Sequence, residues 1–381
     1  MRKLSFLFLF ILPFGLFAQN AIQVKVSGMI FNAKIDSVFI SQNFGSYYKN
    51  YAATALDKKG NFQFNVQLPN PDYYYLRVGS ENIHLILKNN SDIKVYGDGA
   101  LGSRGACLLQ PYADKAGWSG FLLSSPAHFD SIAAKLINTD FQMCTHAIGD
   151  SANRTILKVY AKYLKGKNDK RWRIEHAQII DPNDFHYFGD NSIIPSVQPT
   201  HGTSDMYWAG ERLGAARLKG GYAYKQLLEQ NNWLPLGTDF PVEEINPFKT
   251  FLAAAVRKDA KGFPTDGFQM ENVLTREQTI RGMTIWAAKA NRMEHQVGSL
   301  EVGKKADLVI IRATDLNMVP IHDPVSTVVM QTSVHNIDTV IINGQVKKKD
   351  GKILFENLDA YKSQLEKSGK GLMEKLRKSM H

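Results

Sequence analysis

Cysteine is scarce in this chain of 381 residues, which contains only Cys107 and Cys144. Two cysteines allow at most one disulfide bridge within the chain, and their spacing matches no metal-binding motif. No Cys-x-x-Cys pair is present, which argues against a thiol–disulfide oxidoreductase. Internal repeats are also missing, and glycine and proline occur at ordinary levels, with 29 and 14 residues. This composition excludes a disulfide scaffold, a collagen-like protein and a disordered chain.

Long apolar runs are missing after the first eighteen residues. Arg2 and Lys3 precede an uncharged run over residues 4–17, and Leu16-Phe17-Ala18 is typical of a cleavage site. The run is shorter than the roughly twenty apolar residues that a transmembrane helix needs. We therefore expect residues 1–18 to be a secretory signal peptide, with an N-terminal membrane anchor as the alternative. The mature protein is expected to be exported, periplasmic or secreted, without a membrane span.

Basic residues outnumber acidic residues by 46 to 36, which gives a net charge of +10. Half of this excess lies in residues 341–381, which carry ten Lys and Arg against five Asp and Glu. A basic, solvated tail over residues 347–381 explains this distribution better than a groove that binds phosphates. We predict no nucleic-acid partner.

Residues 20–97 show short strand-like segments of period two, separated by Gly, Asn, Asp and Pro turns. This pattern predicts a small, all-β antiparallel module. The clearest alternating segments are 24–26, 37–40, 62–66 and 83–87. On phrases such as Asp36-Ser37-Val38-Phe39-Ile40, the module resembles the β-rich module that precedes exported thiol–disulfide proteins of some bacteria. No catalytic residue comes with that resemblance.

The pattern changes after about Asp98, where apolar strand-like runs alternate with amphipathic helical stretches. This alternation is typical of βα units around a parallel sheet. The candidate strands are 93–96, 141–147, 172–177, 193–198 and 233–238, and the candidate helices between them are 127–137, 151–164 and 222–230.

A capping box formed by Thr275 and Gln278 predicts the start of one long helix that continues through Ala290. Residues 298–346 are then expected to hold a small β segment, with strands near 304–311 and 338–344. A lysine-rich helix over 358–380 is expected at the end of the chain.

Three side chains suited to metal binding end strand-like runs: His146, His176 and Asp239. In a βα barrel the C-terminal ends of the strands meet at one mouth, where catalysis occurs. Histidine and aspartate can hold a divalent metal, and an incompletely filled coordination shell allows it to activate water. The residues alone also allow a plainer interpretation, in which the histidines are packing residues and Asp239, before Phe240-Pro241, forms a turn.

Six phrases in order carry a resemblance to the amidohydrolase superfamily, in the branch known as amidohydrolase 3. The resemblance covers residues 93–316, about 60% of the chain. The phrases are Asp98-Gly99-Ala100-Leu101-Gly102-Ser103-Arg104, His146-Ala147-Ile148-Gly149-Asp150, Ile174-Glu175-His176-Ala177-Gln178, Gln198-Pro199-Thr200-His201, Gly237-Thr238-Asp239-Phe240-Pro241 and the segment 298–309.

The resemblance implies a role for each of five residues. His146 and His176 would be metal ligands on barrel strands five and six. Asp239, on strand eight, would bind the metal and deprotonate the attacking water, and His201, after strand seven, would contact substrate. Lys94 falls where many relatives have a strand-four residue, sometimes a carbamylated lysine, that bridges two metals. Lys94 also fits the end of the β-rich module, and both interpretations stay open.

Two features of the family are missing from the sequence. No two of the ten histidines are two positions apart, so the His-x-His pair of strand one is absent. Only five candidate strands precede residue 298, whereas a closed barrel needs eight. We therefore predict an α/β fold with a partial TIM-type barrel over residues 98–297. The open sheet would expose backbone groups and apolar surface, and we expect a homo-oligomer or a second chain to cover it.

The function that the resemblance implies is an exported, metal-dependent hydrolase of carbon–nitrogen bonds other than peptide bonds. We expect one divalent ion rather than two, with zinc as the expected metal, and a small amide-like substrate. In such a reaction Asp239 takes a proton from the activated water and passes it to the leaving nitrogen. Loss of the His-x-His pair would impair this activity. The alternative is therefore a non-catalytic envelope binding protein, or a truncated or fused remnant of an amidohydrolase.

Overall fold

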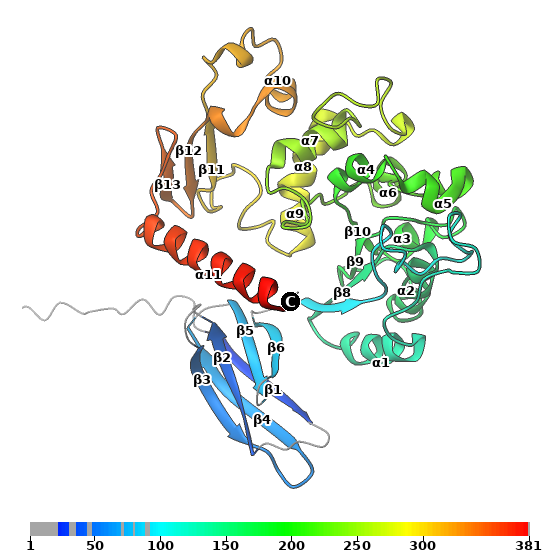
Figure 1. Ribbon diagram of the computed structural model, residues 1–381, viewed down its shortest axis with the longest axis vertical. Coiled ribbons are helices and arrows are strands. Elements are labelled where there is room, and N and C mark those ends of the chain that lie inside the picture. The colour runs from blue at the N-terminus through cyan, green and yellow to red at the C-terminus, as the bar shows by residue number, and fades with distance from the viewer. Residues whose placement is uncertain are drawn as a thin grey trace, which may run out of the picture. The chain divides into compact units, whose positions relative to one another are not determined.

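The computed structural model describes residues 22–29, 36–43, 48–69, 72–78, 81–87 and 92–379 (Figure 1). The signal peptide expected at residues 1–18 lies outside the described residues. The chain divides into two compact units. The first unit comprises the residues up to Ile93 together with Asp140–Gln142, and the second comprises Lys94–Thr139 and Met143–His381.

The first unit is made of antiparallel strands, as the alternating pattern predicts. One sheet has the order β3-β2-β5-β6, and β1 pairs with β4. In β4 every second side chain is buried, because successive residues of a strand face opposite sides. The buried core includes Ile40, Phe64 and Tyr74. The strands are β1 (Ile22–Met29), β2 (Ser37–Asn43), β3 (Tyr48–Ala55), β4 (Asn61–Leu68), β5 (Asp72–Val78) and β6 (Glu81–Leu87).

The second unit contains a four-stranded sheet with the order β10-β9-β8-β7. Strand β9 lies between β8 and β10 and is parallel to both. The four strands are β7 (Asp92–Tyr96), β8 (Gln142–Ala147), β9 (Arg173–His176) and β10 (Ile194–Ser196). The helices between them are α1 (Pro126–Leu136), α2 (Asp150–Leu164) and α3 (His186–Asp190). This order of strands and helices is that of βα units, and each strand coincides with a predicted one.

The fifth predicted strand, over residues 233–238, does not form a strand. The segment is joined to the end of β10 by a single parallel bridge between Val197 and Leu236. Val197 donates to the carbonyl of Pro235 at 3.2 Å, and Gly237 donates to the carbonyl of Val197 at 3.0 Å. The prediction of a strand was wrong because proline lacks the N–H that a regular ladder requires.

The second unit continues with helices and short 3₁₀ turns. They are α4 (Pro199–Asp205), α5 (Ala209–Leu218), α6 (Tyr224–Asn231), α7 (Pro247–Ala255), η1 (Met270–Asn272), α8 (Arg276–Met283) and α9 (Ile285–Ala290). The capping box of Thr275 and Gln278 is present at the start of α8. The prediction of one long helix from this start is wrong, because the backbone leaves the helical region at Thr284, with φ −124° and ψ −97°.

The break at Thr284 has a tertiary cause. The backbone of Gly298 packs so closely there that a Cβ on it would lie 3.2 Å from the Thr284 carbonyl oxygen. The hydroxyl of Thr284 also donates to the carbonyl of Ile280 at 2.7 Å. A threonine that bonds back to the preceding turn in this way often bends a helix.

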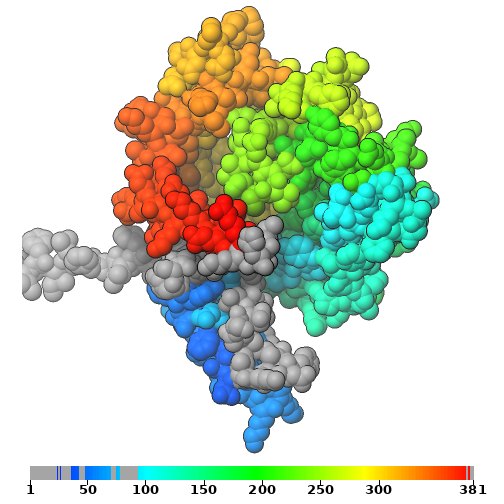
Figure 2. Space-filling model, viewed as in Figure 1, coloured from blue at the N-terminus to red at the C-terminus, as the bar shows by residue number. Residues whose placement is uncertain are grey.

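The C-terminal part of the second unit contains an antiparallel sheet with the order β11-β12-β13-β14, which agrees with the small β segment expected from the sequence. Its strands are β11 (Leu308–Ile311), β12 (Ile337–Ile342), β13 (Gln345–Lys349) and β14 (Lys352–Ile353). The remaining elements are η2 (Leu316–Met318), α10 (Pro324–Gln331), η3 (Val334–Asn336) and α11 (Leu358–Ser379). Helix α11, drawn in red in Figure 2, is largely exposed to solvent. Within the described ranges, every helix is too short or too polar to cross a bilayer.

Candidate metal centre

A cavity of about 600 Å³ opens where the parallel strands of the second unit end. Its walls come from β7, β8 and β9, from helix α4 and from the segment that follows residue 238. The cavity is of the size that small-molecule sites have in proteins. All five residues that the sequence singles out line it: Lys94, His146, His176, His201 and Asp239.

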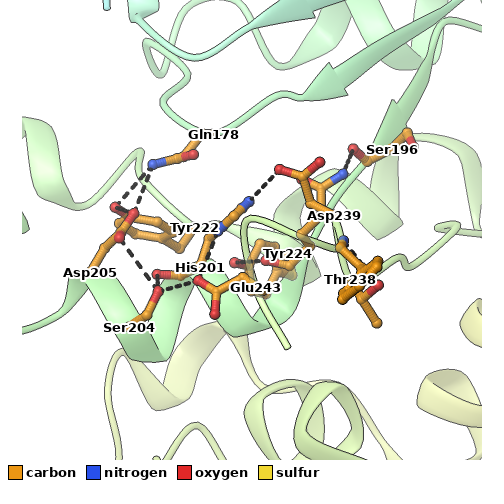
Figure 3. Close-up of polar contacts among 12 residues, drawn as sticks. Gln178, Ser196, His201, Ser204, Asp205, Tyr222, Tyr224, Thr238, Asp239 and Glu243 are labelled. Carbon is orange, nitrogen blue, oxygen red and sulfur yellow. Dashed lines mark hydrogen bonds and ion pairs between the residues drawn. The ribbon is translucent and has the colours of Figure 1, made fainter. Parts of the chain in front are cut away.

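Three of these residues bring their ligand atoms together. His176 ends strand β9, His201 lies on helix α4, and Asp239 lies in the segment after the bridge to β10. One ligand atom from each lies within 4.8 Å of the other two. Nε2 of His201 lies 3.3 Å from Oδ2 of Asp239 (Figure 3). Residues separated by 63 positions in the chain therefore converge on one point.

Two of these residues have an unusual backbone. His176 has φ +73° and Asp239 has φ +58°, both in the left-handed region. A residue other than glycine seldom adopts this conformation, and its cost is of order 1–3 kcal/mol where the region is unfavourable. Such strain is concentrated at functional sites, where the surrounding fold holds a side chain in a required direction. Of the fifteen described non-glycine residues with positive φ, these two line the cavity.

His146 lies beside the group of three rather than within it. Its ring centroid is 4.6 Å from that of His176. The Nδ1 atoms of both rings are buried and have no hydrogen-bond partner among the described residues. Unpaired buried nitrogen atoms of this kind are costly unless a ligand or water satisfies them. The two histidines therefore offer donor atoms that the protein itself leaves unused.

Asp98, just after β7, is almost completely buried and binds three backbone N–H groups. Its carboxylate accepts the backbone N–H groups of Cys107 at 2.8 Å, Ile148 at 3.0 Å and Gly149 at 2.8 Å. Its Oδ1 also lies 3.5 Å from Nδ1 of His146, a distance too long for a good hydrogen bond. The sequence places Asp98 in a family phrase, but no signal in it indicates this role.

His201 is held on both sides of its ring. Nδ1 lies 3.1 Å from Oε1 of Glu243, and Nε2 faces Asp239 (Figure 3). Burial lowers the pKa of His201, but the hydrogen bonds to Asp239 and Glu243 outweigh it and raise the pKa to about 9. The hydrogen bond with His201 in turn lowers the pKa of Glu243. Without a bound cation, His201 is thus an imidazolium between two carboxylates at neutral pH.

His176 has the opposite electrostatic character. Burial lowers the pKa of its imidazole, and the charges of His146 and His201 add to the effect, so that the pKa falls to about 4. Burial alone would raise the pKa of Asp239, but the hydrogen bond to His201 and the nearby histidines lower it. At neutral pH the site therefore presents a neutral His176 and an ionised Asp239, the states in which these groups bind a cation.

A second polar group borders the same cavity. The Tyr222 hydroxyl donates to Oδ2 of Asp205 at 2.8 Å, and Nε2 of Gln178 donates to the same oxygen at 3.1 Å (Figure 3). Burial raises the pKa of Asp205. Asp205 is four positions beyond His201, so helix α4 carries both groups into the cavity wall. The sequence interpretation missed Asp205, Tyr222 and Glu243, because their partners lie in other elements.

Lys94 lines the cavity from strand β7, where its side chain is exposed. It does not belong to the three residues whose ligand atoms converge. His201 does belong to them, although the resemblance implies a contact with substrate for this residue. The geometry thus places His201 where it can serve as a metal ligand.

Comparisons with known proteins agree on one family. The model of the amidohydrolase family matches residues 78–347. Protein LONG AFTER FAR-RED 3 of Arabidopsis thaliana is 34% identical over 58% of this chain and 38% of its own length. A 5-methylthioadenosine/S-adenosylhomocysteine deaminase of Thermoanaerobacter pseudethanolicus is 30% identical over 42% of this chain and 36% of its own length. The chain therefore spans less than half the length of these relatives.

Among solved structures, an uncharacterized metal-dependent hydrolase from Pyrococcus horikoshii matches with 30% identity and a TM-score of 0.48. That match covers 56% of this chain and 42% of the other.

Proposed function

Because this chain belongs to the amidohydrolase family, we propose that it is a metal-dependent hydrolase of carbon–nitrogen bonds other than peptide bonds. The observation that carries the proposal is the convergence of His176, His201 and Asp239 in one cavity. The name of the similar deaminase, a class of enzyme that cleaves a carbon–nitrogen bond, supports this reaction type. The cavity volume of about 600 Å³ supports a small-molecule substrate with an amide-like group.

The donor set fits a single divalent ion. Imidazole nitrogen and carboxylate oxygen are both ligands of zinc, and one such atom from each of the three residues lies within 4.8 Å of the other two. The separation of His201 Nε2 and Asp239 Oδ2 is 3.3 Å. We infer that His176, His201 and Asp239 would hold the ion, with His146 beside them. A divalent ion there would supply Lewis-acid chemistry to the reacting atoms.

The side chains of the site have complementary tasks in hydrolysis. Asp239, ionised because its pKa is lowered, can accept a proton from the attacking water and return it to the leaving nitrogen. His176 stays neutral near pH 7 and so keeps a lone pair. The Asp205–Tyr222–Gln178 group lies on the same wall and presents polar atoms that can orient a substrate.

Metal content tests the proposal directly. The full chain, purified in buffer with added Zn²⁺ and then desalted, should retain about one equivalent of zinc by mass spectrometry. His176→Ala and Asp239→Asn should each lose it, and His146→Ala shows whether His146 takes part. His128→Ala is the matched control, because His128 is exposed on helix α1. Zinc-dependent release of ammonia or amine from a panel of amides and aminated heterocycles would then establish turnover.

The alternative function is a non-catalytic binding protein or a remnant of an amidohydrolase. The missing His-x-His pair supports this alternative. A wild-type chain that binds no zinc, or that binds zinc without turnover on the whole panel, would decide for it.

We also propose that a second copy of the chain covers the open edges of the partial barrel in the second unit. The described sheet β10-β9-β8-β7 has four strands, whereas a closed barrel needs eight. Unpaired strand edges can pair with another chain. Light scattering during size-exclusion chromatography tests this, and a monomeric mass at micromolar concentration would contradict it.

Export of the protein is a separate proposal, supported by the charge-free run over residues 4–17 after Arg2 and Lys3. N-terminal sequencing of protein expressed in a bacterial host tests it. Export predicts a new terminus at Gln19 in the periplasmic fraction, and an intact chain in the cytoplasm would contradict it.

A further inference from the structure

The ring of His201 has two nitrogen atoms in different surroundings. Nε2 faces Asp239 at the point where the three ligand atoms converge. Nδ1 points the opposite way, to Oε1 of Glu243 at 3.1 Å (Figure 3). The His201 side chain is 11% exposed, so neither nitrogen has ready access to bulk water. What lies at Nδ1 therefore decides which nitrogen keeps a free lone pair.

Glu243 is itself fixed in place. The hydroxyl of Ser204 donates to the same oxygen, Oε1, at 2.6 Å. Ser204 lies three positions after His201 on helix α4, so one turn of helix supplies both groups that contact Glu243. The Glu243 side chain is 19% exposed. Its neighbour Glu244 is 67% exposed and pairs with Lys249.

We propose that Glu243 is a positioning residue that accepts the Nδ1 proton of His201 and so directs Nε2 of His201 into the metal centre. The inference rests on the proposed function, since it assigns a task to a residue that supports the same site.

The chemical reason is the tautomer of the imidazole. A carboxylate only accepts hydrogen bonds, so when Nε2 of His201 binds a cation the remaining ring proton on Nδ1 is received by Glu243. Nε2 is then left with a lone pair for a cation. Carboxylates that orient metal-binding histidines in this way raise metal affinity 10–100-fold. Without Glu243, the proton can move to Nε2 and the ring can turn away from Asp239.

Zinc titration of the full chain tests the proposal with two variants of Glu243. Glu243→Ala removes the acceptor, and the dissociation constant for Zn²⁺ should rise roughly 10–100-fold. Glu243→Gln removes the charge but keeps an oxygen that can accept from Nδ1, so it should recover a large part of the affinity. Glu244→Ala, which removes a neighbouring charge outside the network, should bind Zn²⁺ within about twofold of wild type.

Two results of this titration would overturn the proposal. If Glu243→Gln binds as weakly as Glu243→Ala, the negative charge matters and the hydrogen bond to Nδ1 does not. If Glu243→Ala binds Zn²⁺ as well as Glu244→Ala, Glu243 has no positioning task. Circular dichroism checks that each variant is folded. If a Glu243 variant does not fold, Ser204→Ala is used in its place, because it loosens Glu243 without removing it. Ser204→Ala should weaken Zn²⁺ binding by a smaller factor than the loss of Glu243, and unchanged binding would contradict the proposal.

A readout without metal separates this proposal from the proposed function. In the metal-free wild type, the Nδ1 proton of His201 should be visible by ¹⁵N-edited NMR, because its hydrogen bond slows exchange with water. Assignment comes from the loss of the signal in His201→Gln. The signal should disappear in Glu243→Ala and persist in Glu244→Ala. A wild-type chain that shows this signal but binds no Zn²⁺ would refute the metal site alone, whereas a signal unchanged in Glu243→Ala would refute the role of Glu243.

Discussion

Asp98 accepts the backbone N–H of Gly149 at 2.8 Å, although the two residues are 51 positions apart in the chain. The contact joins the end of β7 to the start of helix α2, directly after His146 and β8. Two further backbone donors, from Cys107 and Ile148, converge on the same carboxylate. These bonds tie the loop around Cys107 to the segment that joins β8 to helix α2.

Replacing Asp98 should destabilise the second unit markedly. In Asp98→Asn one oxygen becomes an amide that cannot accept, so at least one buried N–H group loses its partner. We expect a loss of about 2–4 kcal/mol in the free energy of unfolding, measured by urea denaturation. Asp130→Asn, at a surface pair with Lys162, is the control and should leave the midpoint nearly unchanged. Equal midpoints for Asp98→Asn and wild type would refute the structural role of Asp98.

Gly149 is required for a different reason: there is no room for a side chain at this position. A Cβ on Gly149 would lie 2.0 Å from the carbonyl oxygen of Cys107, a backbone atom that cannot move alone. Gly149→Ala should therefore cost about 1–3 kcal/mol of stability in thermal or urea unfolding.

Gly369→Ala provides the comparison for this substitution. A Cβ on Gly369 meets nothing within 4 Å in helix α11, and alanine there should be neutral or stabilising by up to about 1 kcal/mol. An equal effect of the two substitutions would contradict the close approach at Gly149.

Binding of Zn²⁺ at pH 7.5 should release a proton from the site. The pKa of His201 is raised to about 9, so its ring is protonated at this pH and must lose one proton to bind a cation. The pKa of His176 is lowered to about 4, so this ring contributes none. Calorimetric titrations in buffers of different ionisation enthalpy should give about one proton per ion. No release would show that His201 does not bind the metal.

Chelator-treated protein should be most stable near pH 6.5. The folded-state pKa of His176, about 4, lies below the usual 6.5, so stability falls as pH decreases from 6.5 through 4. The folded-state pKa of His201, about 9, lies above 6.5, so its contribution is complete below 6.5 and is lost as pH rises through 9. Each change is on the order of 3 kcal/mol.

Melting temperatures measured between pH 4 and 10 test this dependence. His176→Gln should flatten the acidic side of the profile, and His201→Gln should flatten the alkaline side. A wild-type profile that is flat between pH 6.5 and 9 would contradict the ion pairs of His201.

The elements that local pattern defines were predictable from sequence. Strands β8 and β9 are short strand-like runs that carry His146 and His176 at or next to their C-terminal ends, and the parallel arrangement follows from the alternation with helices. The capping box at Thr275 depends only on residues three positions apart, and it is present.

Features that depend on distant contacts were not predictable. The helix break at Thr284 is tied to the packing of Gly298. The segment 233–238 is apolar like a strand, yet Pro235 lies beside Val197 and limits the contact to one bridge. No sequence pattern distinguishes Glu243 or Tyr222, because their partners on helix α4 become neighbours only in the folded chain.

Helix α4 presents His201, Ser204 and Asp205 from little more than one turn, and these residues contact Glu243 on one side and Tyr222 on the other. Any tilt of this short segment would disturb both contacts at once, which makes it a poor starting point for redesign. Directed evolution toward new substrates should therefore leave this turn intact. Accepted changes should gather at Trp208 and Val242, which border the same cavity.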